Sequence, residues 1–251
     1  MANEAKRKQS RHEEIADALR AKIDDGSLAP GEKLPSEKHL LEEYGVSLTT
    51  MRQALDTLKG EGLIASRQGY GITVREFRPL RRPAVQRLSK EAWLSGKSIW
   101  DGDLEDRPWR VDVDVDEAVP PLKVAKLFGL APDAVMCRRS RRFHVDGRPV
   151  QLAVSYLPAD LVAGTRITEK DTGPGGLYAR LADLGKEPVR FREEVRARMP
   201  RPAEAESLAL ASGTPVLEIV RIAATDEGEV VEVNDMLLDA GSYILDYVFS
   251  S

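Results

Sequence analysis

The apolar positions of residues 10–60 recur every three or four residues in three separate runs, which is the period of amphipathic helices. Ser10 and Glu13 have the spacing of a capping box, so the first helix is expected to begin there and to end at Gly26. Ser36 and Ser47 are expected to cap the second and third helices. The three predicted core faces are Ile15, Leu19 and Ile23; Leu40, Leu41 and Tyr44; and Met51, Ala54, Leu55 and Leu58.

Two short runs of β type follow the third helix, at residues 63–66 and 72–74, with glycine turn chemistry between them. Three short helices and a hairpin predict a winged helix-turn-helix, whose third helix enters the major groove of DNA. At about 100° per residue, Thr49, Arg52 and Gln53 point away from the core face of that helix. These side chains are therefore candidates for contacts with DNA.

The pattern changes to alternation in the second half of the chain. Residues 111–116 read Val-Asp-Val-Asp-Val-Asp, which predicts a strand with one wet face. An Asp-Gly turn at residues 146–147 predicts a hairpin, and helical runs interrupt the strands. The further strands are expected at 134–144, 149–157, 189–199, 216–224, 230–238 and 243–249, and the helices at 121–129, 177–184 and 203–211. This order predicts an α+β domain with a mostly antiparallel sheet.

Charge is distributed unevenly along the 251 residues. Residues 1–90 carry 17 Lys and Arg against 13 Asp and Glu, whereas residues 91–251 carry 20 against 28. Only the first part is therefore suited to approach phosphates. A single cysteine, the absence of an apolar run of membrane-spanning length and the polar N-terminus predict a cytoplasmic protein with no membrane partner.

The region from Glu13 to Val74 resembles the GntR family of transcriptional regulators through the motifs in LRAKIDDGSLAPGEKLPSEKHLLEEYGVSLTTMRQALDTLKGEGLIASRQGYGITV. The resemblance implies a DNA-binding domain in residues 1–76 and double-stranded operator DNA as partner. It also implies a wing whose tip dips into the minor groove. By this resemblance, the candidate DNA-binding residues are Lys38, Ser47, Thr49, Thr50 and Arg52, with Gln68 and Gly69 at the wing tip. Gln53 is added because it lies on the outward face of the third helix.

One position departs from the family pattern. Leu48 stands where the family often has an arginine that reads guanine, so the operator preference is expected to differ. For Thr49 and Thr50, a cap or a solvent contact is an equally good interpretation. Arg52 is favoured as a DNA contact because it lies on the outward face of an intact helix-turn-helix.

Residues 77–90 contain two prolines and four arginines and are predicted to form a stiff, basic linker. Contact with phosphates is one interpretation, and a solvated hinge is the favoured one. Residues 91–251 are expected to form a second domain. Roughly residues 90–249 resemble the UTRA effector domain of the HutC subfamily, through RRFHVDGRPVQLAVSYLP and VVEVNDMLLDAGSYILDY. This resemblance implies a chorismate-lyase-like fold, a small-molecule effector and pairing of two chains as a homodimer.

The same resemblance implies an effector site. Arg141, Tyr178 and Glu232 match polar positions of sugar-phosphate-binding members. Three other positions depart from that set, namely Phe143, Ala153 and Gly176. The implied ligand is therefore less polar or differently charged than a plain sugar phosphate. The alternative is that Arg141 and Glu232 pair with each other or face solvent.

Three other clusters have a weaker claim to chemistry. Asp112, Asp114 and Asp116 share one strand face with no His or Cys nearby in sequence, so a solvated face is expected and no metal site. The glycine-rich loop at residues 172–176 precedes a helix, where free N–H groups could hold an anion, but an ordinary connection is as good an interpretation. Alternation sends Arg139 and Arg141 to one face of their strand and Arg138 and Arg142 to the other, and the sequence leaves open which face is solvated.

An enzyme is the main alternative, since the implied fold is shared with a lyase. No catalytic constellation supports it, because His12, His39 and His144 are scattered and Cys137 lies in a strand where a buried thiol is expected. No cofactor motif is present either. We therefore expect a transcriptional regulator, with no enzymatic activity and no cofactor. A DNA-binding protein that responds to no ligand is the remaining alternative.

Overall fold

The computed structural model describes residues 9–67, 69–76, 79–83, 86–91, 104, 107–131 and 133–248. The chain divides into two compact units, one up to residue 78 and one that holds nearly all residues from 79 onward. Among the described residues, no helix is long and apolar enough to cross a membrane.

The first unit contains the three expected helices and the hairpin. They are α1 (Arg11–Asp24), α2 (Glu37–Tyr44), α3 (Leu48–Gly60), β1 (Ile64–Arg67) and β2 (Gly71–Val74). At the start of α1 the backbone N–H of Ser10 donates to Glu13 at 2.8 Å. Ser36 and Ser47 accept backbone N–H groups at the starts of α2 and α3, each at 3.3 Å. The serine caps are therefore confirmed.

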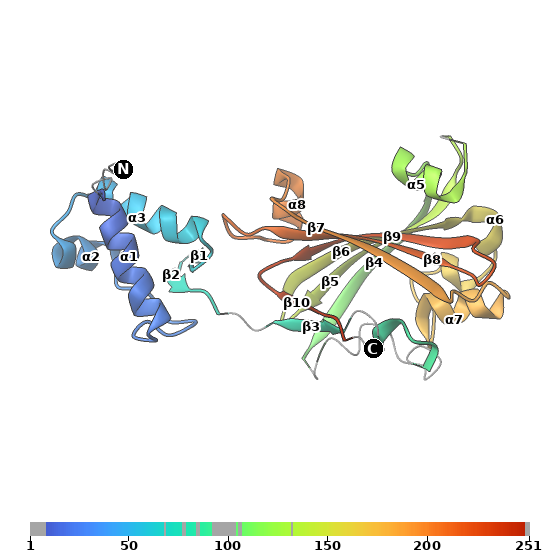
Figure 1. The fold of residues 1–251 in the computed structure, drawn as a ribbon, viewed down its shortest axis with the longest axis horizontal. Coiled ribbons are helices and arrows are strands. Elements are labelled where there is room, and N and C mark those ends of the chain that lie inside the picture. Colours follow the sequence, from blue (N-terminus) through green and yellow to red (C-terminus); the bar gives the residue numbers. More distant parts are fainter. Residues whose placement is uncertain are drawn as a thin grey trace, which may run out of the picture. The chain divides into compact units, whose positions relative to one another are not determined.

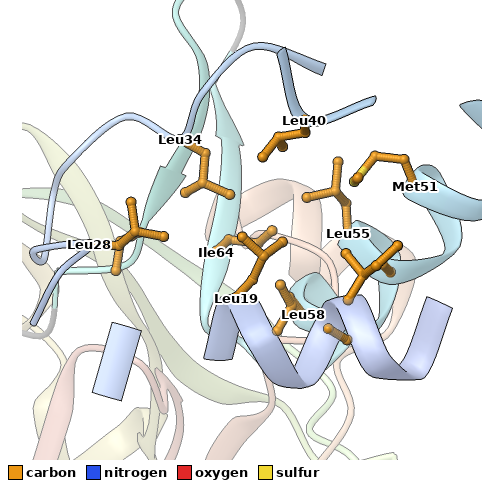
Figure 2. Packing of buried hydrophobic residues seen from close by; sticks show 12 residues of the cluster. Leu19, Leu28, Leu34, Leu40, Met51, Leu55, Leu58 and Ile64 are labelled. Carbon is orange, nitrogen blue, oxygen red and sulfur yellow. The ribbon is translucent and has the colours of Figure 1, made fainter. Parts of the chain in front are cut away.

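One apolar cluster holds this unit together. Leu19 of α1, Leu40 of α2 and Leu55 of α3 point toward one another, as Figure 2 shows. Each of these side chains is at most 1% exposed. Ile64 and Val74 close the cluster from β1 and β2, whose antiparallel register pairs these two residues. Burial of this shared core fixes the orientation of α3 and thereby decides which of its residues face solvent.

The second unit is built on a six-stranded antiparallel sheet with the order β4-β5-β6-β9-β8-β7. Its strands are β4 (Trp109–Ala118), β5 (Met136–Val145), β6 (Arg148–Pro158), β7 (Arg190–Arg198), β8 (Val216–Ala224) and β9 (Val230–Asp239). Asp146 and Gly147 both have positive φ in the β5–β6 turn, as a tight hairpin requires. The predicted α+β class with a mostly antiparallel sheet is confirmed.

The helices and short segments of this unit cover both faces of the sheet. They are α5 (Leu122–Phe128), α6 (Ala159–Val162), α7 (Gly176–Asp183), α8 (Pro202–Ser207) and the 3-10 turns at Gln86–Leu88 and Arg166–Thr168. Figure 1 shows α7 on one side of the sheet and α5 on the other. Val162, Ile167 and Tyr178 pack with Leu157 and Ala223 on what we call the inner face.

A second, two-stranded sheet corrects the prediction of a solvated hinge. Residues 80–83, within the expected linker, form β3 (Leu80–Pro83), which pairs in parallel with β10 (Tyr243–Asp246). Figure 1 shows these two strands side by side, although they come from distant parts of the chain. Leu80 and Arg82 are buried because alternation turns both toward the larger sheet. Leu80 packs in an apolar cluster with Phe143 and Ile219, and Arg82 pairs with Glu193. Phe77 and Arg78 lie outside the described residues.

Candidate functional site

The exposed face of α3 is polar at its N-terminal end. Thr49, Arg52 and Gln53 are exposed, as the helical period predicts, while Thr50 is half-buried. The hydroxyl of Ser47 accepts from the N–H of Thr50, so the cap interpretation applies to this serine. Leu48 is 42% exposed at the first position of the helix. An exposed leucine offers an apolar contact, of the kind that a thymine methyl group makes, and no hydrogen bond.

Arg52 is oriented by an acidic neighbour. Its Nη2 lies 3.5 Å from Oε2 of Glu37, and both side chains are more than a third exposed. An ion pair this exposed contributes little to stability, so a phosphate or a base can replace the carboxylate at small cost. Lys38, the residue after Glu37, is also exposed. The basic side chains are therefore available on the side of the unit that carries the third helix.

The wing is described only in part. Gly69 lies at its tip with a φ of 76°, a conformation that favours glycine. Gln68 lies outside the described residues. The Nζ atom of Lys33 lies 5.2 Å from the ring centroid of Tyr70, which adds a cation beside the hairpin.

The inner face of the larger sheet carries a row of polar residues through an apolar core. The cross-strand register aligns Arg139, Ser155, Asn234, Arg221 and Glu193 on five successive strands. The residues of this row, which we call the polar row, are nearly all buried. Buried polar groups need partners, so such a row inside a core is a candidate binding site.

The three predicted effector residues meet at this row. Tyr178 of α7 donates to Oε2 of Glu232 on β9 at 2.8 Å. Ser155 donates to the other oxygen of Glu232 at 2.5 Å, and Arg141 of β5 donates to the hydroxyl of Ser155. Arg141 and Glu232 thus connect through a serine, not directly. The desolvation that accompanies burial raises the pKa of Tyr178, so its hydroxyl stays protonated and donates.

A second carboxylate lies at the far end of the polar row. Glu193 of β7 accepts from Arg221 Nε at 2.8 Å and from both terminal nitrogens of Arg82, at 2.9 and 2.5 Å. Burial alone would raise the pKa of Glu193, but the two guanidinium groups outweigh it and lower the pKa to about 2. Arg221 also donates to the hydroxyl of Tyr178 at 3.3 Å, so the two carboxylates belong to one network.

Arginine outnumbers glutamate in this network. Arg139 is accommodated by main-chain carbonyls of Ile167, Glu169 and Lys170, and burial together with the charge of Arg141 lowers its pKa to about 10. Burial lowers the pKa of Arg141 in the same way. Four buried polar atoms of the network lack a hydrogen-bond partner among the described residues, namely Arg82 Nε, Arg141 Nε, Arg221 Nη2 and Asn234 Oδ1. Such atoms can bind a ligand that brings an anion and a donor.

Sequence reasoning missed Ser155, Arg221, Glu193 and Arg82 as members of this site. Arg221 alternates with the apolar side chains of Ile219 and Ala223 on the buried side of β8, and that interruption was the available signal. The signal could be used only once the buried face of each strand was known.

The weaker clusters have ordinary explanations. Asp112, Asp114 and Asp116 are exposed on β4; Asp116 pairs with Arg138, and Asp112 lies 2.9 Å from His144. No group of metal-ligating side chains is present among the described residues. In the glycine-rich loop the N–H of Gly173 donates to Asp171 at 2.8 Å. Burial raises the pKa of the Cys137 thiol, which suits a structural cysteine.

Two family models match separate parts of the chain. The model of the bacterial regulatory proteins of the gntR family matches residues 11–74, and the UTRA domain model matches residues 112–243. A winged helix joined to such a domain defines a class of transcriptional regulators that bind operator DNA and a small-molecule effector, not a class of enzymes. The chain belongs to the GntR family and has the UTRA architecture of its HutC-type members.

Individual relatives are similar over almost the full chain. An HTH-type transcriptional regulator of Streptomyces coelicolor is 34% identical, over 87% of this chain and 85% of the relative. The HTH-type transcriptional repressor NagR of Bacillus subtilis is 25% identical, over 87% and 86%. The crystal structure of a GntR-family transcriptional regulator is similar with a TM-score of 0.65 and 26% identity, covering 97% of this chain and 98% of that one.

Proposed function

We propose that this protein is a repressor whose operator binding is controlled by an anionic small molecule bound beside Arg141, Tyr178 and Glu232. The observation that carries the proposal is the convergence of these residues, from β5, α7 and β9, on one hydrogen-bonded network. They are far apart in sequence, so the fold alone brings them together. The unpartnered nitrogens of the network support the proposal, because they are donors that such a ligand could use.

The chemistry of the network defines the class of ligand. Four arginines against two glutamates leave an excess of positive charge, which a carboxylate or a phosphate compensates. Asn234 Oδ1 is an unpartnered acceptor among the described residues, so the ligand is expected to carry a hydroxyl or amine donor. Phe143 and Ala153 are buried beside Arg141 and favour a body less polar than a sugar.

The operator-binding residues of this proposal are those on α2, α3 and the wing. Helix-turn-helix proteins place the N-terminal residues of such a helix against base edges and use neighbouring side chains for phosphates. We assign this role to Lys38, Ser47, Thr49, Thr50, Arg52, Gln53, Gln68 and Gly69.

The proposal includes a domain assignment and an oligomeric state. We assign residues 1–76 to DNA binding, and we extend the effector domain, expected from residue 91, to begin at β3. A single winged helix covers one half-site, so a homodimer in the cytoplasm is the form that binds an operator. The naming of a B. subtilis relative as a repressor supports the direction of control.

A thermal-shift screen tests the effector site. Wild type, Arg141→Gln and Arg138→Gln are each heated with a panel of carboxylates and phosphate esters. Arg138 is the matched control, since it lies on the same strand, faces the other side of the sheet and pairs with Asp116. A ligand is expected to raise the melting temperature of wild type and Arg138→Gln only. An equal rise in Arg141→Gln would contradict the proposed site.

A further inference from the structure

Strand β3 is attached to the polar row by one side chain. The guanidinium of Arg82 is fully buried and donates to both oxygens of Glu193, at 2.9 and 2.5 Å. Bidentate pairs of this kind are among the stronger polar contacts in proteins. β3 is also the first strand after the winged helix, and residues 75–79 connect it to β2. The hold on β3 therefore acts at the start of the effector domain.

Glu193 is shared between this strand and the proposed effector site. Its Oε1 accepts from Arg82 and also from Arg221 Nε, at 2.8 Å. Arg221 reaches Tyr178 with one nitrogen, and its Nη2 has no hydrogen-bond partner among the described residues. Two buried cations that share one carboxylate repel each other, because charges interact strongly away from water. The strength of either pair therefore depends on what else the other arginine contacts.

We propose that Glu193 transmits occupancy of the effector site to strand β3. This inference rests on the proposed function, since it requires an anion beside Arg221. An anion bound there compensates the charge of Arg221 and weakens the ion pair between Arg221 and Glu193. The Arg82–Glu193 pair then strengthens, and β3 is held more firmly against the sheet. Glu193 acts as a positioning residue in this scheme, and Arg221 is an additional ligand-contacting residue.

Hydrogen–deuterium exchange of the full chain tests the proposal with inorganic phosphate as the probe anion. The amides of Leu80–Arg82 report on β3, and the amides of α7 report on the effector site. Potassium chloride at equal ionic strength is the control for screening. Phosphate is expected to slow exchange at both places in wild type. In Glu193→Gln it is expected to slow exchange at α7 only.

Two variants measure how strongly the Arg82–Glu193 pair stabilises β3 when no anion is added. Glu193→Gln is expected to speed exchange of the β3 amides by about tenfold, because it removes a buried ionic partner. Glu204→Gln is the matched control, since it removes a carboxylate that binds Arg198 elsewhere in the same unit and should leave β3 unchanged. Arg82→Lys keeps the positive charge but loses the bidentate hydrogen bonds to Glu193. If Glu193→Gln does not fold, Arg82→Lys tests the same contact, and the exchange rate of the β3 amides is expected to rise by a smaller factor.

The possible results separate this inference from the proposed function. If phosphate protects α7 in wild type and leaves β3 unchanged, or protects β3 equally in Glu193→Gln, transmission through Glu193 is wrong and the effector site stands. If phosphate protects neither place, the proposed anion site is wrong, and the inference that rests on it fails too.

Discussion

Glu193 is the carboxylate of the polar row, and its pKa is lowered. Two buried guanidinium groups lower its pKa from 4.5 to about 2 despite its burial. A carboxylate with a lowered pKa in the folded state contributes stability that is fully present above its ordinary pKa. That contribution is lost as the pH falls from about 4.5 through about 2.

Glu193→Gln is therefore expected to destabilise the effector domain in a pH-dependent way. At pH 7 the free energy of unfolding should fall by about 3 kcal/mol, since two buried arginines lose their ionic partner. At pH 3 the difference from wild type should be smaller. Urea denaturation at the two pH values measures it, and an equal difference at both would mean that the carboxylate is not held as an ion pair.

Arg52 is the exposed arginine on the outward face of α3, and we expect it to contact DNA. Arg52→Ala is expected to weaken operator binding by about 1–3 kcal/mol if the side chain reads a base. Lys59→Ala is the matched control on the same helix, because Lys59 lies in the last turn and pairs with Asp56. Footprinting at matched salt gives the comparison, and equal protection by both variants would show that α3 is not the recognition helix.

Individual residues differed in how far the sequence could assign them. Tyr178 and Glu232 came from a family resemblance, and their contact at 2.8 Å agrees with a shared site. Arg82 was assigned to a basic linker, because the residue type alone does not distinguish a buried arginine from a solvated one. Its burial depends on Glu193, which lies far along the chain.

At the scale of elements, the N-terminus of α3 combines two roles in one residue. The Ser47 hydroxyl caps the helix by accepting from Thr50, and it also lies where DNA contact is expected. Substitutions that keep or remove the cap can separate the two roles, because aspartate caps as well as serine but brings a negative charge.

Ser47→Ala is expected to lower the free energy of unfolding of the DNA-binding unit by about 1 kcal/mol. Ser47→Asp should keep the stability near that of wild type and still weaken DNA binding, since its carboxylate repels phosphates. Thermal denaturation and anisotropy with duplex DNA measure the two effects. Wild-type DNA affinity in Ser47→Asp would show that the hydroxyl is only a cap.

Elements with a strong local pattern were predictable. The three helices of the first unit begin at serine caps, and the larger sheet follows the alternation of β4 to β9. β3 was not predictable, because its four residues, which include a proline, are too few to show the alternation of apolar and polar positions typical of a strand. Its partner β10 ends at Asp246, earlier than the apolar run suggested, since the parallel pairing with β3 stops there.

At the scale of the whole molecule, operator recognition requires two winged helices. We expect a homodimer that binds a pseudo-palindrome with half-sites about one helical turn apart. Multi-angle light scattering at micromolar concentration, with and without DNA, measures the mass against 27.7 kDa for one chain. A monomer under both conditions would contradict this organisation.

In the proposed function, one buried network controls operator binding in response to a ligand. An operator can be selected from random duplexes with the purified protein, and a ligand comes from the thermal-shift screen. Arg141→Gln and its control Arg138→Gln are then titrated onto labelled operator beside wild type, with and without that ligand.

Fluorescence anisotropy of that operator is the most direct measurement. Without ligand, all three proteins should bind with similar Kd, because neither substitution touches the DNA-binding unit. The ligand should weaken binding of wild type and Arg138→Gln by about tenfold, the usual size of allosteric coupling. It should leave Arg141→Gln unchanged. An equal response in Arg141→Gln, or no response in wild type to a ligand that it binds, would show that this network does not control operator binding.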